Sequence, residues 1–195
     1  IKLEDRNLPA IAEHRVLRPV SAEAKRTLDE AFRKLLDARR DVLETLQTDE
    51  ADREMFRKLY PFSPALVATL VAVSSVLQRE RTALKLMMQL LVDRRDELEV
   101  GQVIGVGDLW DVIASGDQPF SEGMRVHFDN AKRLWQQKLL PLLERQHGVS
   151  WAQVQQGDAA EATARAFRSD MRVLKTLLLA APLAAQAQTA NVTLY

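Results

Sequence analysis

Two consecutive apolar segments, beginning at Ser63-Pro64 and at Arg81, most constrain the fold of this chain. Serine followed by proline is a strong helix start, because the serine side chain caps free amide groups and proline suits the first helical position. The pattern predicts one helix from Ser63 to about Leu77 and a second from about Arg81 to Asp93. The first is apolar on most sides, which indicates burial. We therefore expect two packed helices that meet at a basic corner.

Helical patterns also precede and follow this pair. Ser21 is expected to cap a long helix that reaches about Leu46, because apolar residues recur there at three- and four-residue steps. Ser121 is expected to cap another, which Pro141 must kink or restart and which Gly148 ends.

The C-terminal part predicts a last long helix. Asp158-Ala159-Ala160-Glu161 resembles a capping box that opens it. The small and polar tail after Ala184 predicts fraying, and residues 191–195 are a candidate strand. The fold class expected from all these patterns is all-α, a multi-helix orthogonal bundle with a helical extension and little or no sheet.

The composition is that of a folded, electrically balanced protein. The 195 residues are 47% hydrophobic and carry 27 basic and 27 acidic side chains, so no net field attracts nucleic acid or an acidic membrane. Cysteine is absent, which excludes disulfides and thiolate metal sites and fits a reducing compartment. No apolar run has the length of a membrane span. These features favour the cytoplasm.

Candidate catalytic motifs are weak. Residues 101–107 contain three glycines but lack the Gly-Lys-Ser/Thr ending of a phosphate loop, so a turn with a short extended piece is expected. Asp108 is predicted to cap a helix, and Asp111 on the same face is predicted to be solvated. His14, His127 and His147 lie far apart in the sequence and form no metal-binding pattern. Trp135 is expected to be a core anchor.

A family resemblance goes further than these patterns. The stretch Gln78-Arg79-Glu80-Arg81-Thr82-Ala83-Leu84, preceded by the Phe-Ser-Pro helix, resembles the helical lid of AAA+ ATPases. Residues 1–12, 60–70, 106–111 and 132–143 are similar to the large P-loop ATPases of bacterial phage growth limitation and BREX-type phage defence. The resemblance covers most of residues 1–180.

The resemblance implies a division of the chain and a role for one arginine. Residues 1–20 would be the end of an upstream ATPase core and a linker, 21–118 a lid-like domain, 119–183 a helical extension and 184–195 a flexible tail. Arg81 would be a sensor arginine that reaches the nucleotide phosphates, with Arg79 as the rival. The phosphate loop and the Mg-binding acid would lie upstream, so we expect no hydrolysis by this chain alone.

The implied cofactors of the whole protein are ATP and Mg, and the implied partners are the upstream core, oligomer neighbours or other defence proteins. Two alternatives remain open. One is a free-standing helical module for protein–protein interaction. The other is a nucleic-acid-binding helical domain, which requires five basic side chains to gather on one surface: Arg125, Lys132, Arg133, Lys138 and Arg145.

Overall fold

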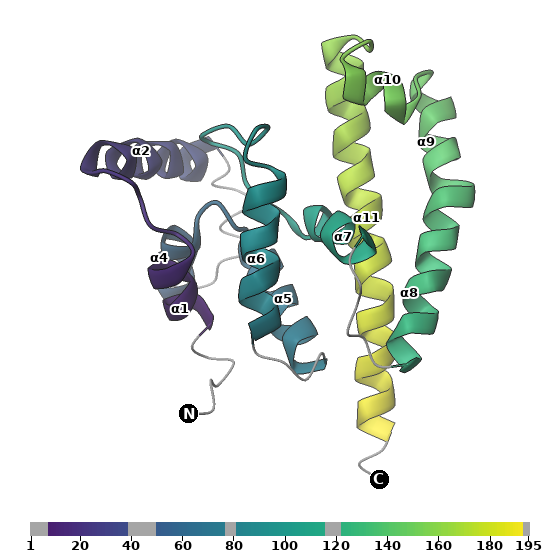
Figure 1. The fold of residues 1–195 in the computed structure, drawn as a ribbon, viewed down its shortest axis with the longest axis horizontal. Helices are drawn as coiled ribbons and strands as arrows, with labels where there is room; N and C mark the ends of the chain where they lie inside the picture. The colour runs from purple at the N-terminus through teal and green to yellow at the C-terminus, as the bar shows by residue number, and fades with distance from the viewer. Residues whose placement is uncertain (1–7, 39–49, 77–80, 116–121, 193–195) are drawn as a thin grey trace. The chain divides into compact units, whose positions relative to one another are not determined.

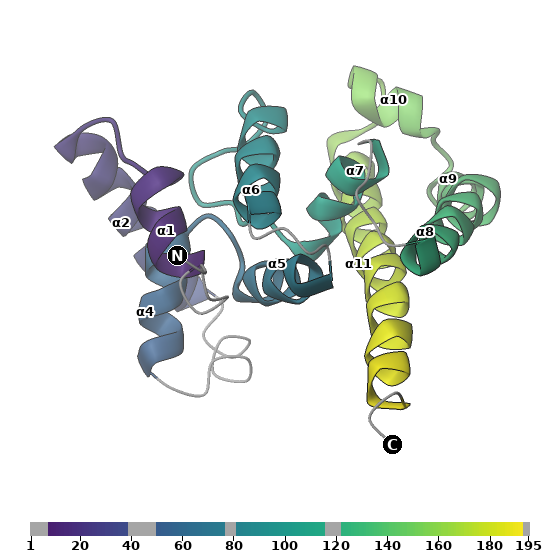
Figure 2. The same ribbon diagram turned by 60° about the horizontal axis from the view of Figure 1, so that its bottom comes forward.

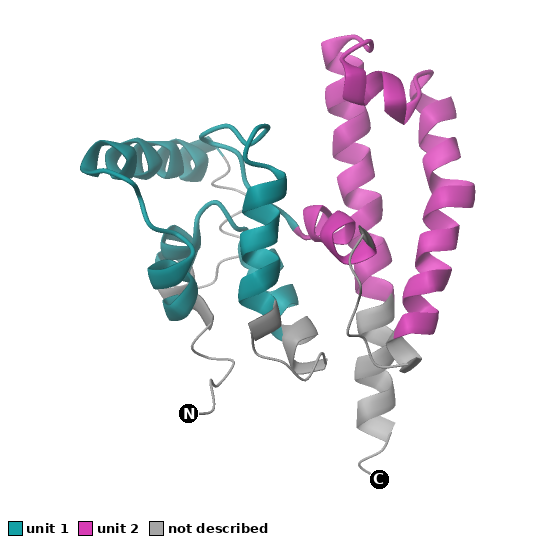
Figure 3. Cartoon of the chain, viewed as in Figure 1, with its two compact units in different colours: residues 1–105 teal, residues 106–195 magenta. Residues whose placement is uncertain are grey.

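The computed structural model describes residues 8–38, 50–76, 81–115 and 122–192. Its chain divides into two compact units, residues 1–105 and 106–195, which Figure 3 colours separately. Each unit is considered by itself. In the described ranges the regular elements are helices, and extended pairing is limited to one isolated parallel bridge between Phe62 and Ile104. The predicted all-α class is confirmed.

Unit 1 contains five described helices, which pack through neighbouring apolar faces. Helix α1 contacts α4 and α6, α4 contacts α5, and α5 contacts α6 (Figures 1 and 2). The elements are α1 (Leu8–Arg15), α2 (Ala22–Ala38), α4 (Glu50–Leu59), α5 (Pro64–Val76) and α6 (Arg81–Asp93).

The apolar helix pair forms the centre of this unit, as its sequence predicts. Leu66 and Leu70 of α5 are fully buried, as is Met87 of α6. The methionine therefore fills the core. The predicted bounds of α6, Arg81 to Asp93, agree with the structure.

The two predicted serine caps of unit 1 are confirmed. The hydroxyl oxygen of Ser21 accepts a hydrogen bond from the amide of Ala24 at 3.0 Å, and that of Ser63 accepts one from Leu66 at 3.1 Å. Each bond satisfies an amide that the first turn of a helix leaves without a partner. Helix α2 is described to Ala38, and the predicted end near Leu46 lies outside the described residues.

The glycine-containing segment after α6 forms a turn and a short extended piece, as expected. Gly101 has φ +103°, a conformation that glycine adopts without a steric penalty. The amide of Ile104 donates to the carbonyl of Pro61 at 2.8 Å, and the carbonyl of Ile104 accepts from Ser63 at 2.9 Å. This pairing holds the segment against the start of α5.

Unit 2 is built on two long antiparallel helical segments. Helix α8, a π-helical turn and α9 form one, α11 forms the other, and α10 lies between them in sequence, while α7 packs on α11 (Figures 1 and 2). The elements are α7 (Val106–Ser115), α8 (Glu122–Leu134), η2 (Trp135–Leu139), α9 (Leu140–His147), α10 (Trp151–Gln156) and α11 (Glu161–Val192).

The predicted restart at Pro141 takes the form of a π-helical turn. The amide of Leu140 donates to the carbonyl of Trp135, a five-residue step, and Pro141 then falls in the first turn of α9. Proline is tolerated in a first turn because its missing amide has no partner to lose there. Gly148 ends α9 with φ +68°, which confirms the predicted stop.

Two helix starts in unit 2 differ from the prediction. Helix α7 begins at Val106, so Asp108 lies inside the first turn and is not the cap. Helix α11 begins at Glu161, so the predicted capping box is misplaced: the amide of Asp158 donates to the carbonyl of Gln153 and closes the end of α10 instead.

The tail is more regular than its composition predicts. Helix α11 continues to Val192, so the candidate strand is wrong for residues 191 and 192. The predicted cap Ser121 and residues 193–195 of the candidate strand lie outside the described residues. The two compact units divide at Gly105, whereas the sequence divides the lid from the extension at residue 118; the predicted domain bounds stay a prediction.

None of the described helices combines the length and apolarity needed to cross a bilayer.

Candidate functional site

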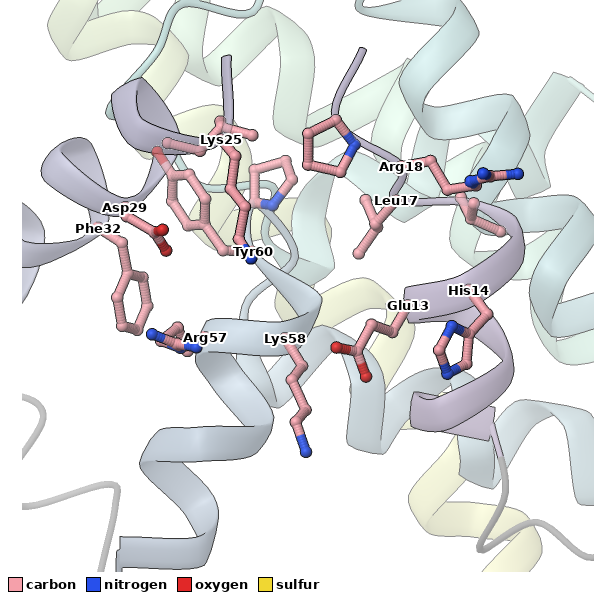
Figure 4. Close-up of a pocket in the computed structure, with 14 residues that line it drawn as sticks. Glu13, His14, Leu17, Arg18, Lys25, Asp29, Phe32, Arg57, Lys58 and Tyr60 are labelled. Carbon is pink, nitrogen blue, oxygen red and sulfur yellow. The ribbon is translucent and has the colours of Figure 1, made fainter. Parts of the chain in front are cut away.

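A pocket of about 490 Å³ lies in unit 1 between α1, the segment that follows it, α2 and the end of α4. In Figure 4, Glu13 and His14 lie on one side of it and Asp29, Phe32 and Arg57 on the other. Its volume is in the range of cavities that hold small organic ligands. All the lining residues that the structure describes belong to unit 1.

The inner wall of the pocket is apolar and rigidly packed. Phe32 is in edge-to-face contact with Phe56 and Tyr60, with ring centroids 5.1 and 5.6 Å apart. These three rings are the buried centre of a cluster to which Leu28 also contributes. Val16, Leu17, Pro19 and Pro61 also belong to the apolar lining. Because edge-to-face rings interlock, the wall is preformed.

Tyr60 links this wall to the segment behind it. Its hydroxyl oxygen accepts a hydrogen bond from the amide of Gly101 at 2.9 Å. Burial raises the pKa of the Tyr60 phenol, and the bond from Gly101 partly opposes that rise. The phenol is therefore neutral at physiological pH and acts as a fixed part of the wall.

The charged lining of the pocket is unbalanced. Four cationic side chains, Arg18, Lys25, Arg57 and Lys58, line it with two carboxylates, Glu13 and Asp29; because Glu54 outside the lining neutralises Lys58, an excess of one positive charge remains. The whole chain, by contrast, has equal numbers of basic and acidic residues. The pocket is therefore a local positive region on a neutral protein.

One of the four cations is already engaged. The Lys58 ammonium lies 2.9 Å from the Glu54 carboxylate, one turn earlier on α4. This bond raises the pKa of Lys58 and lowers that of Glu54, and the charge of Glu13 contributes a smaller part of the rise at Lys58. Among the described residues, no carboxylate forms an ion pair with Arg18, Lys25 or Arg57.

The structure places the two arginines of the sequence prediction at the start of α6. Arg81 is the first residue of that helix, but its side chain is outside the described part of the chain, and Arg79 lies wholly outside it. The described lining of the pocket includes no residue of α6. The role of either arginine in sensing nucleotide stays a prediction.

A second polar cluster joins α7 to α11 in unit 2. Asp108 lies 3.1 Å from Arg172 inside the first turn of α7, so the prediction that it is the cap is wrong. Asp111 binds Lys175 through both oxygens at 2.6 and 2.7 Å, and its side chain is 64% exposed, so it is solvated as predicted but also forms an ion pair. The Lys175 side chain is only 5% exposed and lies under the ring of Trp135, 5.2 Å from its centroid. Trp135 also packs against the core, as expected.

The histidines have separate surroundings. His14 lines the pocket, His127 is exposed, and His147 is 2.9 Å from Asp170 at the end of α9. Within the described ranges, no three His, Asp or Glu side chains converge on a possible metal site.

The described residues thus define an all-α protein with a ligand-sized pocket whose lining has more cations than carboxylates. The family described as "BREX System ATPase PglY protein 2nd domain" matches residues 9–193, almost the whole chain, and the chain belongs to this family. The resemblance to BREX-type ATPases is therefore confirmed. A search of solved structures gave no significant match.

Proposed function

We propose that this chain is the nucleotide-sensing helical lid of a phage-defence ATPase, in which ATP and Mg are bound by a core elsewhere in the whole protein. Its membership in a family named as the second domain of a BREX ATPase carries the proposal. In this role the chain responds to the phosphate state of the core and passes the change to the core's neighbours or to other defence proteins.

The apolar helix pair is suited to such a role. Helix α5 is capped by Ser63, and its buried Leu66 and Leu70 belong to the same apolar core as Ala83 and Met87 of α6. A pair packed in this way moves as a rigid body, so a contact at the first residue of α6 is transmitted along the helix. A cation at a helix N-terminus is opposed by the helix dipole, and a phosphate at that point would offset the cost.

The test uses the full-length ATPase and compares arginine variants with a matched control. Arg81→Ala should lower ATP turnover by about tenfold, the effect of losing one charge-assisted bond to a phosphate. Lys85→Ala, one turn later on an exposed position of α6, should leave turnover unchanged. Arg79→Ala is tested in the same way. If only Arg79→Ala lowers ATP turnover, Arg79 is the sensor arginine. Unchanged ATP turnover in both Arg81→Ala and Arg79→Ala would reject the proposed lid function.

A free-standing interaction module is the alternative, and the coding sequence distinguishes it from the lid. A Gly-x-x-x-x-Gly-Lys-Ser/Thr loop followed by an acidic strand upstream of Ile1 would support the lid. A start codon directly before Ile1 would favour the free-standing module.

A further inference from the structure

We infer that the pocket of unit 1 binds a small organic phosphate monoester, with the phosphate held by Lys25 and Arg57 and the organic group placed against the Phe32–Tyr60 wall. None of the described lining residues belongs to α6, and the inference does not depend on the proposed lid function.

The charge of the pocket favours an anionic group. Because Glu54 neutralises Lys58, the remaining three cations of the lining exceed its two carboxylates by one charge. A phosphate monoester is anionic at neutral pH and offers three acceptor oxygens, so it can bind more than one of these cations at once.

Two of the pocket's cations, Lys25 and Arg57, are available to bind a phosphate. Lys25 comes from α2 and Arg57 from α4, both are exposed, and neither forms an ion pair with a described carboxylate. Two cations from different helices can bind one phosphate without first breaking a bond in the protein. An arginine guanidinium, moreover, offers a fork of donors that matches phosphate oxygens.

The remainder of the pocket selects an organic group. Leu17, Leu28 and Pro61 line it together with the buried rings of Phe32 and Tyr60, and inorganic phosphate would leave this apolar surface uncovered. The volume of about 490 Å³ also exceeds what a free phosphate fills. The ligand is therefore expected to be amphipathic.

Binding of phenyl phosphate to the 195-residue chain, measured by titration calorimetry at low salt, tests the inference. Phenyl phosphate should bind at least about tenfold more tightly than inorganic phosphate, which lacks the ring, and than benzyl alcohol, which lacks the charge. No heat with phenyl phosphate up to millimolar concentrations would overturn the inference, as would equal affinity for inorganic phosphate.

Matched variants assign the binding to the pocket. The double change Lys25→Gln and Arg57→Gln should weaken phenyl phosphate binding by about a hundredfold or more, since the loss of each charge-assisted bond weakens binding by about tenfold or more. The control double change, Lys34→Gln and Arg53→Gln, removes exposed cations from the same two helices but outside the pocket, and should have no effect. An equal loss in the control would overturn the assignment.

Two further variants separate binding in the pocket from misfolding and from binding at the Arg81 corner. Asp29→Asn removes a negative charge from the pocket and should tighten binding, a change that misfolding cannot produce. Arg81→Ala should leave phenyl phosphate binding unchanged, whatever its effect on ATP turnover. Weaker binding in Asp29→Asn, or loss of binding in Arg81→Ala, would place the ligand elsewhere and reject the inference.

Discussion

Gly107 of α7 lies directly against the main chain of Arg172 in α11. A β-carbon built on Gly107 would overlap the Arg172 carbonyl oxygen well inside van der Waals contact. The atom in the way is backbone, so no side-chain rotation relieves the overlap. The close packing of α7 on α11 therefore depends on the absence of a side chain at this position.

Gly107→Ala is expected to lower the free energy of unfolding by about 1–3 kcal/mol, the usual cost of overpacking. Without the contact to Arg172, the same substitution would raise the free energy of unfolding, because alanine is favoured over glycine in a helix by about 1 kcal/mol. Urea denaturation provides the measurement.

Gly157→Ala is the control for this variant. Its β-carbon meets no atom within 4 Å, but Gly157 has φ +80°, so the cost is that of backbone strain alone, about 1–2 kcal/mol. Stabilisation by Gly107→Ala would show that α7 and α11 separate more easily than the packing implies.

Removing Asp111 is expected to cost more stability than removing its partner Lys175. Asp111→Ala leaves a buried ammonium without its carboxylate and should lower the unfolding free energy by about 1–3 kcal/mol. Lys175→Met should cost less, because the methionine keeps the buried stem while the Asp111 side chain, 64% exposed, is solvated by water. Chemical denaturation of both variants gives the order, and a larger loss in Lys175→Met would contradict it.

The Ser63 cap should contribute measurably to α5. Ser63→Ala removes the acceptor of the Leu66 amide and should cost about 1 kcal/mol in thermal or urea unfolding. Thr69→Ala on the same helix removes only a bond from the side chain back to the Ala65 carbonyl, and should be near neutral. Equal costs in the two variants would argue against a specific capping effect.

Stability should fall at high pH because of Tyr60. Burial raises its pKa above the ordinary value of 10.0, so the folded state opposes ionisation of the phenol. The stabilisation is complete below the pKa of the unfolded chain and is lost as pH rises through that of the folded state. The free energy of unfolding should therefore decrease above about pH 10.

Tyr60→Phe separates this effect from the titration of other groups. The variant should lose about 1 kcal/mol at neutral pH, since the Gly101 amide loses its acceptor. Its unfolding free energy, measured in urea, should then fall less steeply between pH 9 and about pH 11 than that of the unmodified chain. Parallel pH profiles would exclude Tyr60 as the source.

The features that the sequence predicts correctly are encoded by neighbouring residues. Ser21 and Ser63 cap their helices through bonds to the third residue along the chain, and Gly148 ends α9 by its own backbone conformation. The misplaced start of α11 has a local cause too, because the end of α10 uses the amide of Asp158. A signal for the end of α10 and a signal for the start of α11 overlap at Asp158, and the sequence alone does not show which of them prevails.

The features that the sequence does not reveal depend on distant residues. Asp108 pairs with Arg172 and Asp111 with Lys175 across 64 positions, so their spacing carries no local pattern. The pocket likewise joins Glu13, Lys25 and Arg57 from three separate helices. Neither cluster corresponds to a sequence motif. The two ion pairs of unit 2 have the same separation of 64 residues because α7 and α11 pack side by side in a fixed register.

The π-helical turn at Trp135–Leu139 fixes how this part of the chain tolerates insertions and deletions. Loss of one residue there would let the turn revert to α-helix and leave the helix after it almost unrotated, because five residues in the wider turn cover about the same angle as four in an α-helix. Leu143, which is 3% exposed, would keep its place in the core. In relatives of this chain, a deletion of one residue within these five positions should therefore leave the pattern of apolar residues along α9 unchanged, whereas the same deletion within α9 should alter it.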